Sequence, residues 1–192
     1  MGLPPTVQKY DHDSDSLYSV RGLTKVYGEG PTAVHALRGV DLDLPKSAMV
    51  VLLGASGSGK STFLNIVGGL DDATDGQVFF EGSELTSLGP SQLTEYRRNS
   101  VSFVFQFYAR AVAKRPKVMF CDEPTGALDS QTGVIVLDAL DQINRELGTT
   151  TLLITHNVVI ADMADRLLRF ADGALVEDRA NPDRVAPAEL KW

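Results

Sequence analysis

The chain has 192 residues, of which 43% are hydrophobic and 22% charged, which fits one globular domain with a sizeable core. A formal net charge of −7 argues against a nucleic-acid partner, because such a partner would need a basic face. The sequence has no apolar run of the ~20 residues that span a bilayer and no signal-peptide pattern at its start. We therefore expect a cytoplasmic protein that does not insert into a membrane itself.

Three segments follow one another along the chain. Residues 1–15 are polar and acidic, have little to bury and predict a flexible tail. Residues 16–178 carry the apolar patterning of a folded domain. Residues 179–192 contain repeated proline breaks, so we expect a loosely held C-terminal tail.

The folded domain begins with a predicted antiparallel layer. Residues 17–53 alternate apolar and polar side chains, interrupted by Gly-Glu-Gly and Leu-Pro breaks. This pattern indicates a β-hairpin that leads into a buried strand at Met49–Leu53. His35 falls within the hairpin and is interpreted as an ordinary polar residue, as is His12 in the tail.

A phosphate-binding loop is predicted directly after that buried strand. Residues 54–62 read Gly-Ala-Ser-Gly-Ser-Gly-Lys-Ser-Thr and fit the pattern G-x-x-x-x-G-K-[ST], with helical apolar spacing from Thr62 onward. The glycines let successive N–H groups face inward, and the helix start adds its positive end. In this pattern Lys60 reaches the β- and γ-phosphates and the Ser61 hydroxyl binds Mg²⁺. The residues predicted to bind the nucleotide here are Gly54, Ser56, Gly57, Ser58, Gly59, Lys60, Ser61 and Thr62.

The alternative to a phosphate loop is a glycine-rich strand-to-helix turn that binds nothing. A chance match to the pattern in a chain of this length is on the order of one in a hundred, and the strand–loop–helix context lowers it further. The sequence therefore favours a binding loop.

Further elements follow the loop in chain order. Gln77–Glu81 has the pattern of a short strand, and residues 90–98 predict a helix. Val101–Phe105 predicts another strand and ends at Gln106. Gln106 is either an ordinary polar residue at a strand end or a group aimed at the ligand-binding edge of the sheet.

A second acidic motif agrees with the phosphate loop. Val118–Cys121 reads as a buried strand, with Cys121 as a small core residue, and it ends in Asp122 and Glu123. Ligands of open α/β sheets bind at the carboxyl ends of the strands. Asp122 would hold Mg²⁺ through its water shell, and Glu123 is placed to polarise an attacking water as general base. Two acids after a strand also commonly begin a loop, so the motif gains its weight from the phosphate loop.

The C-terminal half completes an α/β pattern. Residues 131–147 predict a helix whose apolar face carries Val134, Leu137, Leu140 and Ile143. Thr151–Thr155 is another buried strand, and His156 follows it. Residues 166–178 predict a hairpin around an Asp-Gly turn. The expected fold is a P-loop NTPase (RecA-like) core with an N-terminal antiparallel β layer.

The run Asp122-Glu-Pro-Thr-Gly-Ala-Leu-Asp129, together with the phosphate loop, is very similar to the ATPase subunits of ABC transporters. It most resembles the bacterial branch that drives lipoprotein release and macrolide or peptide export. The resemblance covers roughly residues 17–178. It implies an ATPase that uses ATP and Mg²⁺ and lies at the inner (plasma) membrane through a membrane permease subunit.

The resemblance also implies roles for four further positions. Tyr27 stands where the family has an aromatic residue that stacks on adenine, although it could also cap a sheet edge. Gln106 matches a glutamine that touches Mg²⁺ and the lytic water and senses the membrane partner. Residues 127–129 match the loop that crosses the ATPase dimer interface. His156 matches a histidine that contacts the γ-phosphate, whereas a lone histidine after a strand would usually be structural. The implied catalytic residues are Glu123, His156 and Gln106, and the implied metal ligands are Ser61, Gln106 and Asp122.

One part of the family pattern is missing between Gln106 and Asp122. The family has a helical subdomain there with the signature Leu-Ser-Gly-Gly-Gln, whereas this sequence contains no Ser-Gly-Gly. Residues 109–115 look like the end of the helix that normally follows the signature, and as a helix they would span only about 10 Å. The sequence therefore predicts an internal truncation near 108/109 with the helical subdomain absent.

The missing signature has a specific mechanistic consequence. In the family, two ATPase subunits form a head-to-tail homodimer, and each signature helix presents its N-terminus to the other's γ-phosphate. Losing a comparable transition-state donor, such as an arginine finger, costs about 10³–10⁵ in rate. We predict that nucleotide binding is retained at least in part, while ATP turnover and its coupling to transport are severely impaired. The family's homodimer is not expected to form readily in this chain. Exposure of surface around Phe107, Tyr108 and residues 109–115 predicts either marginal stability or self-association.

Three alternatives to a working transporter ATPase remain. A non-hydrolysing nucleotide-binding relic or regulatory module would bind ATP without turnover. An ABC-type ATPase of DNA repair or translation would carry long coiled-coil or duplicated-domain sequence, which this chain lacks. A small-molecule kinase would show a lid segment or an acceptor pocket after the phosphate loop, and the sequence indicates neither.

Overall fold

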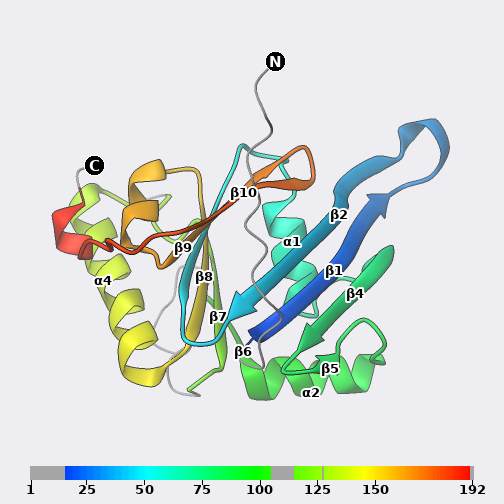
Figure 1. The fold of residues 1–192 in the computed structure, drawn as a ribbon, viewed down its shortest axis with the longest axis horizontal. Helices are drawn as coiled ribbons and strands as arrows, with labels where there is room; N and C mark the ends of the chain where they lie inside the picture. The colour runs from blue at the N-terminus through cyan, green and yellow to red at the C-terminus, as the bar shows by residue number, and fades with distance from the viewer. Residues whose placement is uncertain (1–15, 105–114, 127, 191–192) are drawn as a thin grey trace.

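Two β-sheets, one antiparallel and one mostly parallel, frame the fold (Figure 1). The computed structural model describes residues 16–104, 115–126 and 128–190 of the chain. Within these residues the predicted α/β architecture with an antiparallel N-terminal layer is confirmed. The predicted tail at 1–15, Gln106, the link at 107–114 and Ala127 lie outside the described residues.

The antiparallel sheet is built on a long hairpin. Its strands, in spatial order, are β2 (Val34–Pro45), β1 (Ser16–Tyr27), β4 (Asp75–Phe80) and β5 (Ser83–Glu84). A short 3₁₀ helix, η1 (Gly30–Thr32), joins β1 to β2, and the register places Tyr27 opposite Val34 at the open end. Leu17, Tyr18, Val20 and Leu23 are buried on β1, so the hairpin packs one face onto the core.

The second sheet contains the predicted buried strands. Its strands, in spatial order, are β10 (Ala174–Ala180), β9 (Arg166–Ala171), β3 (Met49–Leu53), β8 (Thr150–Thr155), β7 (Val118–Asp122) and β6 (Val101–Val104). All neighbouring pairs are parallel except the β9–β10 hairpin. Because β3, β8 and β7 are direct neighbours, the loops that follow their carboxyl ends converge.

The parallel sheet is buried on both faces, which explains why its strands read as continuous apolar runs. On β3, Val50 and Leu52 join the core beneath the antiparallel sheet and α1 (Lys60–Val67). Met49, Val51 and Leu53 join a second core with α4 (Ser130–Leu147) and η2 (Val158–Met163). Figure 1 shows α4 on the side of the parallel sheet away from the antiparallel sheet.

Cys121 lies fully buried in the second core, as predicted for a small core residue. Burial raises the pKa of its thiol well above the ordinary value, so the thiol is unreactive.

The helices begin and end near their predicted bounds. Helix α1 starts at Lys60, because Gly59 adopts a left-handed conformation (φ 102°) and serves as its N-cap. Helix α2 (Pro90–Ser100) extends two residues beyond its predicted end. None of the helices within the described ranges is both long and apolar enough to cross a bilayer.

Helix α4 is held at both ends by its caps. The Asp129 side chain accepts a hydrogen bond from the Thr132 N–H at 3.0 Å, and Gly148 ends the helix at φ 64°. Of the predicted apolar face, Leu137 and Leu140 are fully buried, whereas Val134 and Ile143 lie half-buried at its margin. The buried face is completed by Gly133 and Val136.

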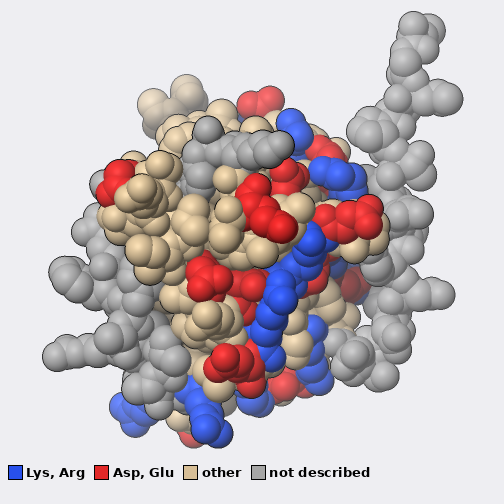
Figure 2. Space-filling model, turned by 90° about the vertical axis from the view of Figure 1, so that its left-hand side faces the viewer, with Lys and Arg blue, Asp and Glu red and all other residues tan. Residues whose placement is uncertain are grey.

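Within the described residues, the segment 179–190 is held by side-chain contacts, unlike the loosely held tail expected from its prolines. Arg184 donates to Asp165 at 2.9 Å and pairs with Asp141 of α4, and Leu190 is buried after the short helix η3 (Pro187–Glu189). Figure 2 looks onto this side of the molecule, where acidic and basic side chains lie next to one another. The prolines therefore do not prevent this segment from pairing with α4.

Candidate functional site

A cavity of about 510 Å³ opens at the carboxyl ends of β3, β7 and β8. Its second wall comes from the antiparallel sheet, through Tyr27 of β1 and residues 34–36 of β2. The predicted site residues that line the cavity are Tyr27, Gly54, Ser56, Gly57, Ser58, Gly59, Lys60, Ser61, Thr62, Asp122, Glu123 and His156. Gln106 lies outside the described residues. One cavity thus brings together residues from five separate elements.

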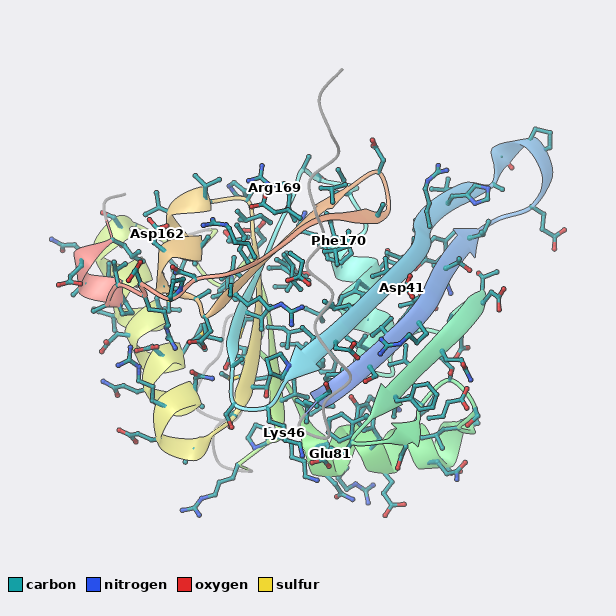
Figure 3. All side chains as sticks on the ribbon, viewed as in Figure 1. Asp41, Lys46, Glu81, Asp162, Arg169 and Phe170 are labelled. Carbon is teal, nitrogen blue, oxygen red and sulfur yellow. The ribbon has the colours of Figure 1, made fainter. Side chains whose placement is uncertain are left out.

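The phosphate loop is packed tightly against its surroundings. A Cβ atom placed on Gly59 would lie 2.6 Å from the carbonyl oxygen of Ala36, so only glycine fits. Behind the loop, Phe63 of α1 packs on Phe170 of β9 with ring centroids 5.4 Å apart. Figure 3 shows Phe170 lying between the strands and α1. The loop therefore has the rigid support that positions a backbone anion site.

The Lys60 side chain is hydrogen-bonded to the backbone of the phosphate loop. Its ammonium donates to the carbonyl oxygens of Gly54 at 2.7 Å and Ala55 at 2.8 Å. Burial lowers the pKa of Lys60, and the nearby negative charges of Glu123 and Asp122 oppose this shift. The ammonium therefore lies against the loop carbonyls, where phosphate oxygens held by the loop would gain a direct cationic partner.

Ser61 and Asp122 form an oxygen pair that suits Mg²⁺. The Ser61 hydroxyl donates to the Asp122 carboxylate at 3.0 Å, although the two residues lie on α1 and β7. Mg²⁺ prefers oxygen ligands, keeps several waters and uses one or two carboxylates together with substrate phosphates. The described residues contain no cage of three or more His, Cys, Asp or Glu ligands, so an ion here would take its other ligands from water and phosphate.

Glu123 and His156 form a second pair at the mouth of the cavity. The Nδ1 atom of His156 lies 3.0 Å from the Glu123 carboxylate, and the Glu123 N–H donates to the Ile154 carbonyl at 3.0 Å. Glu123 adopts φ 47°, an uncommon conformation for a residue with a side chain, of the kind that clusters at functional sites. One carboxylate oxygen is oriented by His156, which leaves the other to accept a proton.

The other end of the cavity carries Tyr27 and His35. The Tyr27 ring is 41% exposed, and its hydroxyl donates to Asp71 at 2.6 Å. His35 was interpreted as an ordinary hairpin residue, yet the structure places it on the cavity wall. The β1–β2 register pairs His35 with Val26, the neighbour of Tyr27. This pairing places His35 on the cavity wall, and the sequence alone does not reveal it.

The fold and the site together define a P-loop NTPase. The phosphate loop joins a buried parallel strand to a helix, and the acid pair follows the strand two places away in the same sheet. Lys60, Ser61 and Asp122 line one cavity, with Ser61 hydrogen-bonded to Asp122.

The chain belongs to the ABC transporter family. The family model described as ABC transporter matches residues 37–109. The lipoprotein-releasing system ATP-binding protein LolD of Geobacter metallireducens is 32% identical, with 85% of this chain and 99% of that protein covered. By this membership the chain is an ABC-type ATPase.

Further relatives confirm the predicted branch. The macrolide export ATP-binding/permease protein MacB 1 of Aeromonas hydrophila is 32% identical over 91% of this chain, which spans 36% of that longer protein. A solved dimer of the ATP-binding cassette MJ0796 bound to ADP and Pi superposes with a TM-score of 0.80 at 26% identity. That match covers 85% of this chain and 98% of the solved chain.

The alignment with the Geobacter protein leaves many positions without a residue of this chain. It extends over 223 positions, whereas 85% of 192 residues is about 163, so about 60 positions of the relative have no counterpart here.

Proposed function

We propose that this chain binds MgATP in the cavity described above and serves as the ATP-binding subunit of a transporter whose membrane permease is its partner. The observation that carries the proposal is the convergence of Tyr27, Lys60, Asp122 and Glu123 on one cavity. Its volume of about 510 Å³ falls in the usual range of small-molecule sites. The permease would hold the protein at the inner membrane.

The proposed residue roles follow the contacts. Tyr27 stacks on the adenine ring at the exposed end of the cavity, and the loop N–H groups and Lys60 hold the phosphates. Ser61, Asp122 and Gln106 would hold Mg²⁺, and the ion would neutralise charge on the phosphate oxygens. The loop residues that hold the phosphates are Gly54, Ser56, Gly57, Ser58, Gly59, Lys60, Ser61 and Thr62.

Hydrolysis would use the pair of Glu123 and His156. Glu123 accepts a proton from a water whose oxygen attacks the γ-phosphorus, while the bond to the β–γ bridging oxygen breaks and ADP leaves. His156 orients the carboxylate and contacts the γ-phosphate. The 3.0 Å contact between the two side chains supports this division of roles.

We further propose that the chain, a domain at 16–178 with an N-terminal tail and a C-terminal segment that packs on α4, is truncated internally near 108/109 and lacks the helical subdomain. The gap of about 60 positions and the absence of Ser-Gly-Gly support this proposal. Without the signature helix, the γ-phosphate has no trans-acting helix N-terminus to stabilise the transition state. The chain would then bind ATP with little turnover and weak coupling to a permease. A non-hydrolysing binding module is the second candidate function, and the same missing motif favours it.

Calorimetric titration and phosphate release on the full chain test these proposals. ATP should bind in the presence of Mg²⁺, and Lys60→Ala should weaken binding by about 10- to 100-fold because a charge-assisted contact is lost. Glu123→Gln should preserve binding and remove any residual hydrolysis. Failure of the wild-type chain to bind ATP would refute the site, whereas robust ATPase activity that depends on a dimer would refute the loss of turnover.

A further inference from the structure

Three side chains at the exposed end of the cavity form a connected group. Asp71 uses both of its carboxylate oxygens there. One accepts from the Tyr27 hydroxyl at 2.6 Å, and the other accepts from the Lys25 ammonium at 2.7 Å. The Lys25 ammonium also lies 4.8 Å from the centroid of the Tyr27 ring. We call Lys25, Tyr27 and Asp71 the tyrosine brace.

The brace is anchored to the loop that follows α1. The Asp72 N–H donates to the Asp71 carboxylate at 2.8 Å, and the Asp72 carbonyl accepts from Lys25 at 2.6 Å. Thr74 ties the same loop to β1, because its hydroxyl accepts from the Val26 N–H at 2.9 Å. The carboxylate of Asp71 is therefore held in place from two directions before any ligand binds.

Burial within the brace is uneven. The side chains of Lys25 and Asp71 are 12% and 28% exposed, whereas Tyr27 is 41% exposed. Burial alone would raise the pKa of Asp71, but hydrogen bonds from Lys25 and Tyr27 lower it below its ordinary value. The anchoring charges are thus sheltered, while the ring of Tyr27 remains open to the cavity.

The strand itself does little to fix the Tyr27 ring. Tyr27 is the last residue of β1, and Gly28 follows it with φ 76° as the chain leaves the sheet. A side chain in this position samples several rotamers unless another group holds its end. The Asp71 hydrogen bond holds that end, and the Lys25 ammonium lies over one face of the ring, which leaves the other face for a planar base.

We propose that Asp71 and Lys25 are positioning residues that hold Tyr27 as a preset stacking surface for the base of the bound nucleotide. The inference rests on the proposed nucleotide site. A ring that is fixed in advance does not lose its rotamer freedom on binding, and this gain corresponds to about two- to twelvefold in affinity. The brace therefore sets the part of the affinity that comes from the base and leaves the part that comes from the phosphates unchanged.

Comparing two ligands separates these two parts. The dissociation constants of ATP and of inorganic triphosphate are measured by calorimetry on the full chain with Mg²⁺. The base ratio is the dissociation constant of triphosphate divided by that of ATP, and it reports the contribution of the nucleoside. Tyr27→Ala should lower this base ratio by about tenfold. Asp71→Ala should lower it by at least about twofold, by no more than Tyr27→Ala does, and should leave triphosphate affinity unchanged. Asp72→Ala removes a neighbouring carboxylate and keeps the backbone groups, so it should leave the ratio at the wild-type value.

A double-mutant cycle sharpens the test. Tyr27→Phe keeps the ring but removes the hydrogen bonds of its hydroxyl with Asp71 and Thr62, so it should reduce the base ratio at least as much as Asp71→Ala does. The double variant should lose no more than Tyr27→Phe alone, because that substitution already removes the Asp71 contact. Additive losses would refute a shared role.

The possible failures are distinguishable. No binding of either ligand by the wild-type chain would refute the proposed function itself. Equal affinities for the two ligands would refute the stacking role and the brace together. A wild-type base ratio in Asp71→Ala would refute the brace alone. An equal loss of both affinities in that variant would assign Asp71 to the folding of the loop and also refute the inference.

Discussion

The turn between β9 and β10 supports the phosphate loop, and replacing Gly173 with alanine should disturb both. The Gly173 N–H donates to the Ser58 carbonyl at 3.2 Å, and its own carbonyl accepts from the Arg38 N–H at 2.9 Å. Gly173 adopts φ 79°, and a Cβ atom there would lie 2.8 Å from the Ala36 carbonyl oxygen. Since the obstructing atom belongs to the backbone of β2, it cannot rotate away.

The expected cost of Gly173→Ala has two parts. The left-handed conformation costs an alanine about 1–2 kcal/mol. Forcing β2 and the turn apart costs about 1–3 kcal/mol more, as for other overpacked sites. Gly82 provides the matched control, because it has φ 80° and its added Cβ would meet no atom of the described residues within 4 Å. Gly82→Ala should therefore cost only the first part, about 1–2 kcal/mol.

Urea unfolding followed by circular dichroism measures both variants against the wild-type chain. Gly173→Ala should lower the unfolding midpoint further than Gly82→Ala, with the same dependence of the free energy on urea. It should also weaken the binding of inorganic triphosphate, because Ser58 belongs to the phosphate loop and Ala36 lines the same cavity. Equal destabilisation by the two substitutions, or unchanged triphosphate binding in Gly173→Ala, would refute the reasoning.

Two further predictions concern ionic groups. Arg184→Ala should reduce the free energy of unfolding by about 2–4 kcal/mol, because it removes a partner of the buried Asp141 carboxylate. Urea unfolding measures this loss, and a loss under about 0.5 kcal/mol would contradict the anchoring of the C-terminal segment by Arg184. Lys60 binds phosphate in its charged form, and burial lowers the pKa of Lys60. Triphosphate affinity should therefore begin to fall, as the pH is raised, before the pH reaches the ordinary lysine pKa of 10.5. The double variant Asp122→Asn/Glu123→Gln lacks the two negative charges that oppose this lowering, so in calorimetric titrations its affinity should begin to fall at a lower pH than that of the wild-type chain; an onset at the same or a higher pH would contradict the prediction.

Sequence reasoning reached the phosphate site because its chemistry is local. The loop at 54–62 and the acid pair Asp122–Glu123 each occupy contiguous residues after an apolar strand, so spacing alone identified both. The parallel order of β3, β8 and β7 then brought them together, and the Ser61–Asp122 contact of 3.0 Å is the direct result.

The adenine end of the site was only partly predictable. Tyr27 was identified through a family resemblance, but nothing near it in the sequence indicated Asp71, which lies 44 residues further along the chain. His35 was missed for a related reason, because its place on the cavity wall depends on the β1–β2 register. The same holds for Arg184, whose partners on α4 and before β9 are distant in the sequence.

The sequence by itself determined the class of fold, the phosphate-binding chemistry and the absence of a Ser-Gly-Gly signature, because each depends on residue types at short, fixed spacing. Only the tertiary structure decided which side chains brace Tyr27, which residue supports the loop from the β9–β10 turn, and how the C-terminal segment is held. These contacts join residues whose separation in the chain carries no signal. Sheet order and strand register bring them within hydrogen-bonding distance, and both are set by the packing of the whole domain.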